Sequence, residues 1–203
     1  AYIAHGRRAT CRNGLRPAAA TDVSGVRNHR MQELEQLALA SRRFGGDGRL
    51  VFLGGGNTSV KCGDTLYIKP SGVSLATLQA GDLVAMNRLQ LRTLVEAPMP
   101  SDVWARERRV KELMGEAVLG KAKARPSVEA PLHEAMPWTY VVHLHPTLVN
   151  GMTCAVDGAS ACARLFPDAL WIEYVDPGYT LARCVAGRLA ESAKSGRRAS
   201  NVV

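Results

Sequence analysis

The run YVVHLH at residues 140–145 places the strongest constraint on how this chain can fold. It is rich in apolar and β-branched side chains, which favour a buried strand. Residues two apart in a strand point to the same face of a sheet, so His143 and His145 are expected to project side by side. The sequence therefore predicts a sheet that carries two neighbouring imidazole groups on one face.

Short apolar runs and amphipathic stretches surround this strand. We expect further strands at 51–53, 57–61, 65–69, 82–87 and 170–175, and helices at 31–44, 101–119, 127–136, 146–155 and 180–192. Gly45 and Gly46 are expected to end the first helix, and Ser127 is expected to cap the third. A helix, a β-meander and then alternating helices and strands predict an α/β domain layered around one sheet.

Length and composition are those of one globular domain. The chain has 203 residues, of which 46% are hydrophobic and 22% are charged, and it is long enough to bury a sizeable core. No apolar run reaches the roughly 18 residues that a membrane-spanning helix needs, so we expect no membrane partner. We place the domain at residues 31–190, between a basic arm at 1–30 and a polar tail at 191–203.

The net charge of +8 is concentrated at the two ends of the chain. Residues 1–30 contribute +5 and residues 191–203 contribute +2, which leaves +1 for the sequence between them. Because the basic residues are terminal rather than part of the domain, we expect no nucleic-acid partner. The arm at 1–30 fits a disordered segment, a transit peptide or non-native sequence upstream of a start at Met31.

Cysteine usage bears on the compartment. The five cysteines, Cys11, Cys62, Cys154, Cys162 and Cys184, are odd in number and widely spaced. They form no Cys-x-x-Cys pair, and the N-terminus lacks the apolar segment of a secretory signal. This pattern favours a reducing compartment with free thiols, so we expect a cytoplasmic protein.

The two histidines of the strand are candidate metal ligands. Neutral imidazole is a common ligand of zinc, and two on one strand supply half of a tetrahedral site. Glu129 lies in the first turn of the helix expected at 127–136, and its carboxylate could bind a metal or act as a general acid/base. His133 shares the face of Glu129, and we interpret it as a partner of that residue or a packing residue. Each of these residues, taken alone, also fits an ordinary structural role.

A glycine-rich segment, GGGNTSVK at 54–61, is followed by KPSG at 69–72. Glycines allow the backbone to approach an anion closely, and the neutral side chains of Asn57, Ser59 and Ser71 can donate hydrogen bonds to phosphate. The spacing matches neither a P-loop nor a dinucleotide-binding fingerprint. An anion site and a glycine-rich hairpin without a ligand both fit these residues.

The motifs GGGNTSVK, KPSG, PSVEAPLH and VVHLHP occur in an order that resembles the class II aldolase/adducin family, which includes fuculose- and rhamnulose-phosphate aldolases. The closing DPGYTLAR is similar to bacterial members, and the resemblance covers about residues 31–190. It implies an α/β/α three-layer sandwich around a mainly antiparallel central sheet. It also implies a homotetramer with sites at the subunit boundaries.

The activity that this resemblance implies is that of a metal-dependent aldolase, a lyase of carbohydrate metabolism that cleaves a small phosphorylated sugar by retro-aldol chemistry. Zn²⁺ or another divalent metal would be held by His143, His145 and Glu129 and would stabilise the enediolate as the C–C bond breaks. Glu129 would also shuttle the proton. The residues that match phosphate-binding positions of the family are Asn57, Ser71, Gly72 and Ser127.

Two departures from the family's pattern bear on activity. Val128 stands where fuculose-phosphate aldolases have a second serine before the glutamate. The family takes a third zinc histidine from a segment after the last helix, and this chain has none there. We therefore expect a weakened metal site, in a truncated product or in a protein of reduced activity. The alternative interpretation is an adducin-like assembly module of the same fold that is non-catalytic or weakly active.

Overall fold

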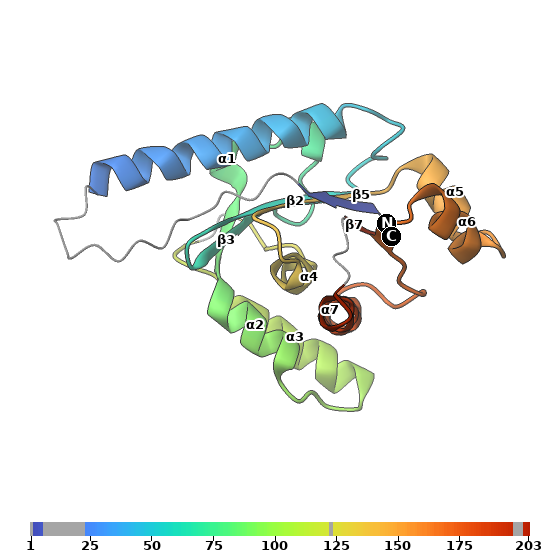
Figure 1. The fold of residues 1–203 in the computed structure, drawn as a ribbon. Coiled ribbons are helices and arrows are strands. Elements are labelled where there is room, and N and C mark those ends of the chain that lie inside the picture. Colours follow the sequence, from blue (N-terminus) through green and yellow to red (C-terminus); the bar gives the residue numbers. More distant parts are fainter. Residues whose placement is uncertain (1, 6–22, 122–123, 197–200) are drawn as a thin grey trace.

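The computed structural model describes residues 2–5, 23–121, 124–196 and 201–203, and its strands form one sheet in the order β4-β3-β2-β5-β1-β7-β6 (Figure 1). The strands are β1 (Tyr2–His5), β2 (Asn57–Cys62), β3 (Thr65–Ile68), β4 (Val84–Asn87), β5 (Tyr140–Leu144), β6 (Ala169–Leu170) and β7 (Asn201–Val202). Neighbouring strands are antiparallel except for β6 and β7, which are parallel. The sheet is therefore mainly antiparallel, as predicted.

Helices cover both faces of this sheet. The α-helices are α1 (Val23–Gly45), α2 (Arg88–Glu96), α3 (Val103–Glu116), α4 (Ala130–Ala135), α5 (Thr147–Thr153), α6 (Gly158–Leu165) and α7 (Tyr179–Lys194). Figure 1 shows α1 on one face, α4 and α7 on the other with α2 and α3 beyond them, and α5 and α6 beside one end of the sheet. This arrangement confirms the α/β/α three-layer sandwich.

Side-chain alternation along β2 divides its residues between the two helical layers. Thr58 points to α1, where its hydroxyl oxygen lies 2.8 Å from that of Ser41, and Val60 packs in the same layer. Asn57 and Ser59 point the other way, toward the segment that leads into α4 and toward α4 itself. A strand places successive side chains on opposite faces. Thr58 and Val60 of this short strand therefore pack against the α1 layer, while Asn57 and Ser59 supply polar groups to the α4 layer.

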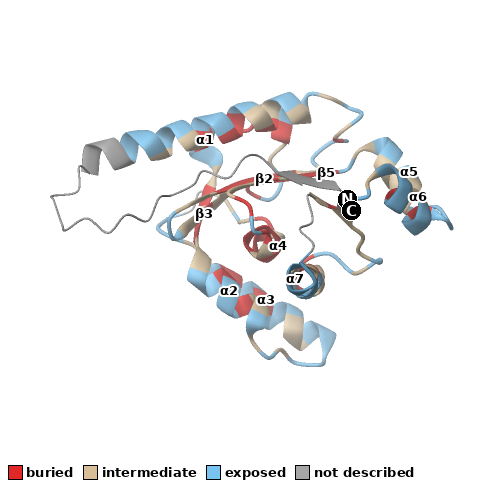
Figure 2. Cartoon of the chain, viewed as in Figure 1, coloured by how far each residue is buried: buried red, intermediate tan, exposed pale blue. Residues whose placement is uncertain are grey.

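Apolar clusters fill the space on both sides of the sheet. The cluster under α1 contains Leu34, Leu37, Ala38, Val60 and Ala80. The clusters on the α4 side include Leu66, Ile68, Met86, Leu91, Leu94, Leu132, Met136, Val141 and Val185. Burial is concentrated on β2, β5 and α4 in Figure 2, and each fully buried side chain of this size contributes about 1.5–3 kcal/mol.

An ionic cluster fixes α4 to its neighbours. The buried carboxylate of Glu134 in α4 accepts hydrogen bonds from Nε of Arg88, at 2.9 and 3.1 Å. The ammonium group of Lys61 in β2 donates to the backbone carbonyls of Glu134 and Met136, at the end of α4. Burial lowers the pKa of Lys61 to about 8, although the charge of Glu134 acts in the opposite direction. These contacts hold the short helix that carries Glu129 and His133 against the sheet.

Most of the expected elements are present, but several boundaries differ. The first helix ends at Gly45 as predicted, yet it begins at Val23 rather than at residue 31. The strand expected at 51–53 is wrong, because Leu53 has a positive φ of 53° and the amide of Gly55 donates to the carbonyl of Phe52, which makes a turn. The segment is instead attached to the end of β5 through a hydrogen bond from the amide of His145 to the carbonyl of Leu50.

The sequence reasoning missed two helices and lengthened one strand. Helix α2 follows β4 directly, and the side chain of Asn87 caps it by accepting from the amide of Gln90. Helix α6 also went unrecognised. The strand expected at 170–175 is only Ala169–Leu170, because its partner β7 is two residues long.

The two terminal segments also differ from expectation. Most of the arm expected at 1–30 lies at 6–22, outside the described residues, but β1 pairs with β5 on one side of it and α1 begins on the other. Within the segment expected as a polar tail, 191–203, α7 continues to Lys194 and the side chains of Val202 and Val203 are buried. The two valines pack against β6 and α7 and are shielded from water. Residues 197–200, between α7 and β7, lie outside the described part of the chain.

Two properties of the described residues bear on the environment of the protein. Cys62, Cys154, Cys162 and Cys184 are free thiols, while Cys11 lies outside the described residues. Among the described helices, none combines the length and the apolar character that crossing a membrane requires.

Gly45 is expected to be essential for the contact between α1 and the turn at Leu75–Thr77. A Cβ atom at Gly45 would lie 2.3 Å from the backbone nitrogen of Ala76 and 2.6 Å from the carbonyl carbon of Leu75. Gly45→Ala should therefore lower the free energy of unfolding by about 1–3 kcal/mol in urea denaturation. Gly48→Ala is the control, because nothing lies within 4 Å of its added Cβ. Equal losses in the two variants would contradict this account.

Candidate metal centre

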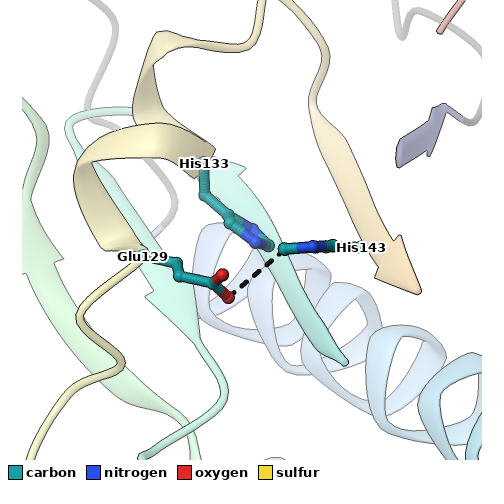
Figure 3. Close-up of side chains that lie close together, drawn as sticks. All are labelled: Glu129, His133 and His143. Carbon is teal, nitrogen blue, oxygen red and sulfur yellow. Dashed lines mark ion pairs between the residues drawn. The ribbon is translucent and has the colours of Figure 1, made fainter. Parts of the chain in front are cut away.

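Helix α4 carries two of the candidate residues on one side. Glu129 is its N-cap residue, rather than Ser127 as predicted, although the Ser127 hydroxyl accepts a hydrogen bond from the amide of Glu129 at 3.2 Å. His133 lies one turn later, and its amide donates to the carbonyl of Glu129. Figure 3 shows both side chains reaching from α4 toward His143 of β5.

His143 lies between α4 and the sheet with 1% of its surface exposed. Its Nδ1 is 3.2 Å from Oε2 of Glu129 (the dashed line in Figure 3), an ion-pair distance without the direction of a hydrogen bond. Neither of its ring nitrogens has a hydrogen-bond partner. Buried polar atoms are nearly always paired in folded proteins, so two unpaired nitrogens on one ring point to a missing ligand.

His133 adds a third group to this site. Its Nδ1 lies 2.8 Å from the hydroxyl oxygen of Ser59, whereas its Nε2 is buried and unpaired. One ligand atom from each of Glu129, His133 and His143 lies within 4.8 Å of the other two. Ligand atoms bound about 2.1 Å from one tetrahedral zinc ion are about 3.4 Å apart. Small inward movements of these side chains would therefore bring all three onto one ion, and the residues fit a metal.

His145 lies at the outer end of the same row of imidazoles. It is the first residue beyond β5 and is exposed, and its ring centroid is 4.9 Å from that of His143. Glu129, His143 and His145 all line one pocket of about 600 Å³. The pocket therefore reaches the expected ligands from the solvent side, while His133 lies deeper.

The remaining wall of the pocket is largely apolar. It comes from α4, α7, the segment after β6 and the C-terminal strand, and includes Leu132, Trp171, Ile172, Tyr174, Leu181, Val185, Val202 and Val203. Such walls exclude water from part of the site and strengthen electrostatic interactions there.

The charges of the site suit metal binding. Burial alone would raise the pKa of Glu129, but the neighbouring His143, together with His133 and Asn57, lowers it to about 2. Burial lowers the pKa of His133 to about 3 and also lowers that of His145. At neutral pH the site thus offers the ionised carboxylate of Glu129 and the neutral imidazoles of His133 and His145, the protonation states that a divalent cation requires.

The four residues expected to bind phosphate fall into two pairs. Nδ2 of Asn57 donates to the hydroxyl of Ser127 at 2.5 Å, and both residues are buried. Ser71 and Gly72 are exposed in the turn after β3, and the amide of Ser71 donates to the carbonyl of Arg125. That bond places the turn beside the segment that contains Ser127. None of the four lines the 600 Å³ pocket, and their role in phosphate binding stays a prediction.

Asn57 connects this polar group to the metal centre. Its Nδ2 also lies 3.4 Å from Oε2 of Glu129, and it is paired with His143 across β2 and β5. The ammonium of nearby Lys69 donates to the carbonyl of Val73 at 2.7 Å, which holds the turn that contains Ser71 and Gly72. Burial lowers the pKa of Lys69, although the charge of Glu129 raises it.

The sequence reasoning missed His133 as a member of the cluster. The signal was present, because the spacing of four residues places His133 on the same helix face as Glu129. The sequence did not show that Ser59 would engage one ring nitrogen and leave the other facing His143.

Residues 35–202 match the sequence family described as the Class II Aldolase and Adducin N-terminal domain. The chain therefore belongs to the class II aldolase/adducin family. It is similar to YuxG, an uncharacterized oxidoreductase of Bacillus subtilis (strain 168), with 27% identity over 169 residues that cover 78% of this chain and 24% of that protein. The chain thus spans about a quarter of the length of this relative.

Solved structures share the fold. The N-terminal class II aldolase domain of a conserved protein from Thermoplasma acidophilum has a TM-score of 0.67 at 23% identity, over 86% of this chain and 78% of that chain. YgbL from Escherichia coli has a TM-score of 0.53 at 20% identity, with 84% and 72% covered. L-fuculose 1-phosphate aldolase from Glaciozyma antarctica PI12 has a TM-score of 0.50 at 19% identity, with 84% and 62% covered.

The burial of His133 predicts a pH dependence of stability. Its pKa falls from 6.5 to about 3 on folding, so between these values the unfolded chain binds a proton that the folded protein does not. The free energy of unfolding of the metal-free protein should therefore decrease as the pH falls below about 6.5, by up to about 1.4 kcal/mol per pH unit from this residue. Urea denaturation in the presence of a chelator, between about pH 5 and 6.5, measures this slope.

His133→Gln should make the slope shallower by that amount. His29→Gln is the control, because the side chain of His29 is 75% exposed on α1, and it should keep the slope of the unmodified protein. An unchanged slope in His133→Gln would show that the imidazole is not held neutral by burial.

Proposed function

We propose that this domain is a metal-dependent lyase that cleaves a small phosphorylated sugar by retro-aldol chemistry. The observation that carries this proposal is the contact between the ionised Glu129 and His143, a buried imidazole with no hydrogen-bond partner, at the end of an open pocket. Family membership and the fold shared with an L-fuculose 1-phosphate aldolase support the same reaction class.

The metal would be held by His143, His145 and Glu129, and Zn²⁺ suits two imidazoles and a carboxylate. When bound, it supplies a Lewis acid that withdraws electron density from a carbonyl oxygen of the substrate. The backbone hydrogen bond from His145 to Leu50 fixes the turn that begins just after β5. The exposed edge of His145 and the pocket on that side leave room for a small substrate.

Glu129 is suited to proton transfer. Cleavage of the C–C bond turns the neighbouring hydroxyl into a carbonyl and releases its proton, and the carbon that keeps the bonding electrons takes up a proton. As an ionised carboxylate at neutral pH, Glu129 can accept the proton that the hydroxyl releases and then return it to that carbon, and the reverse reaction runs through the same transfers. Asn57 donates to the same Oε2 atom and limits its movement.

The phosphate group of the substrate would be bound by Asn57, Ser71, Gly72 and Ser127. The buried contact between Asn57 and Ser127 orients two neutral polar groups, and the turn at 71–72 offers exposed backbone and hydroxyl groups next to them. The positive φ of 81° at Gly72 favours glycine there. We propose a homotetramer because of the family resemblance, and a cytoplasmic location because of the free thiols.

An adducin-like assembly module is the second candidate. One observation that favours it is Val128, an apolar residue that is 59% exposed between Ser127 and Glu129, where a subunit contact would bury it. The two functions differ in what they require of the metal centre, because an assembly module has no need of a reactive carboxylate.

Glu129→Gln should reduce retro-aldol turnover of fuculose 1-phosphate or rhamnulose 1-phosphate by roughly 10²–10⁴-fold, because the amide cannot carry the proton. Aldehyde release in a coupled assay measures the rate, and urea denaturation shows that the variant is folded. Glu112→Gln is the matched control, because Glu112 is an exposed residue of α3 paired with Arg109. Equal turnover in both variants would refute the role of Glu129, and binding of stoichiometric metal without turnover of any sugar phosphate would favour the assembly module.

Inorganic phosphate should raise the thermal midpoint of the protein. Ligand at 100 times its dissociation constant stabilises a folded state by about 2.7 kcal/mol, which is readily detected by differential scanning fluorimetry. Ser71→Ala should reduce the shift, and because the side chain of Ser71 is exposed, the substitution should leave the fold intact. Ser160→Ala, on the distant helix α6, should leave it unchanged. The absence of a shift at millimolar phosphate would contradict the anion site.

A further inference from the structure

We propose that His133, oriented by Ser59, is a further nitrogen ligand of the metal. This inference rests on the proposed metal-dependent function and extends its ligand set inward from His143. It assigns a chemical role to a side chain that sequence spacing alone leaves as a packing residue.

The position of His133 carries the first step of the argument. Its side chain is fully buried, and its ring centroid is 6.1 Å from that of His143. Its Nε2 is among the buried side-chain atoms that have no hydrogen-bond partner. Together with Glu129 and His143 it forms the group of ligand atoms that lie within 4.8 Å of one another. An unpaired buried nitrogen either destabilises the folded protein or binds a ligand. Only ligand binding explains why this nitrogen faces a carboxylate and a second unpaired imidazole.

Ser59 supplies the second step. Its hydroxyl oxygen lies 2.8 Å from Nδ1 of His133. When Nδ1–H donates to that oxygen, the proton of the neutral ring is on Nδ1, and Nε2 presents its lone pair to the site. Metal-bound histidines commonly donate their other ring N–H to a fixed oxygen, which sets both the tautomer and the orientation of the ring. Ser59 is buried in β2, and a strand is a rigid support for such a contact.

The resulting ligand set is chemically coherent. Glu129, His133 and His143 offer ligand atoms that lie within 4.8 Å of one another, and His145 lies on the solvent side of His143, with 4.9 Å between the two ring centroids. With the His145 of the proposed function, the set would be three imidazoles and one carboxylate, which suit zinc.

Metal affinity and ligand counting test this proposal without reference to catalysis. Zinc affinity is measured by competition with a chromogenic chelator on the full chain, for the unmodified protein, His133→Gln, Ser59→Ala and the control His29→Gln. We expect His133→Gln to weaken binding at least tenfold, Ser59→Ala to weaken it by about 10–100-fold, and His29→Gln to have no effect. Urea denaturation in chelator separates loss of ligand from loss of fold.

X-ray absorption at the zinc edge of the unmodified protein counts the imidazoles directly, so the test does not depend on any variant folding. Three imidazoles in the unmodified protein, with one fewer in His133→Gln, support the proposal. Two imidazoles, with the same zinc affinity in His133→Gln, overturn it and leave the proposed function intact. Failure of the unmodified protein to bind zinc, cobalt or manganese overturns both.

Discussion

The antiparallel pairing of β2 with β5 is the constraint on which the rest of the site depends. It places Asn57 directly opposite His143, and the alternation of side chains then sends both toward α4. The same alternation directs Ser59 to His133, two positions further along β2. A shift of this pairing by one residue would turn every one of these side chains to the α1 face and abolish the site.

Burying a carboxylate among histidines requires that the supporting helix be held firmly. Helix α4 has only six residues, which is too short to be stable alone. It is held by its apolar contacts with α7 and the sheet, by the Arg88–Glu134 ion pair at its far end and by Lys61 beneath its last carbonyl groups. The position of Glu129 therefore depends on residues that never contact a substrate.

Much of this could be predicted from the sequence, because the relevant signals are local. The apolar run around His143, the glycine stop at Gly45 and the order of helices and strands gave the layered fold. What could not be predicted depends on contacts distant in the chain. The turn at Leu53 depends on hydrogen bonds to the end of β5, the two-residue strand β6 depends on a partner at the C-terminus, and the orientation of His133 depends on Ser59, 74 positions away.

The central claim is that Glu129 and His143 bind one divalent metal beside an open pocket. Diffraction from zinc-soaked crystals on both sides of the zinc absorption edge tests it most directly, because an anomalous peak locates the ion without assumptions about activity. The account predicts one strong peak about 2.0–2.2 Å from Oε2 of Glu129 and from a ring nitrogen of His143. A well-ordered site with no peak there, or with zinc bound only at surface groups such as His29, would contradict it.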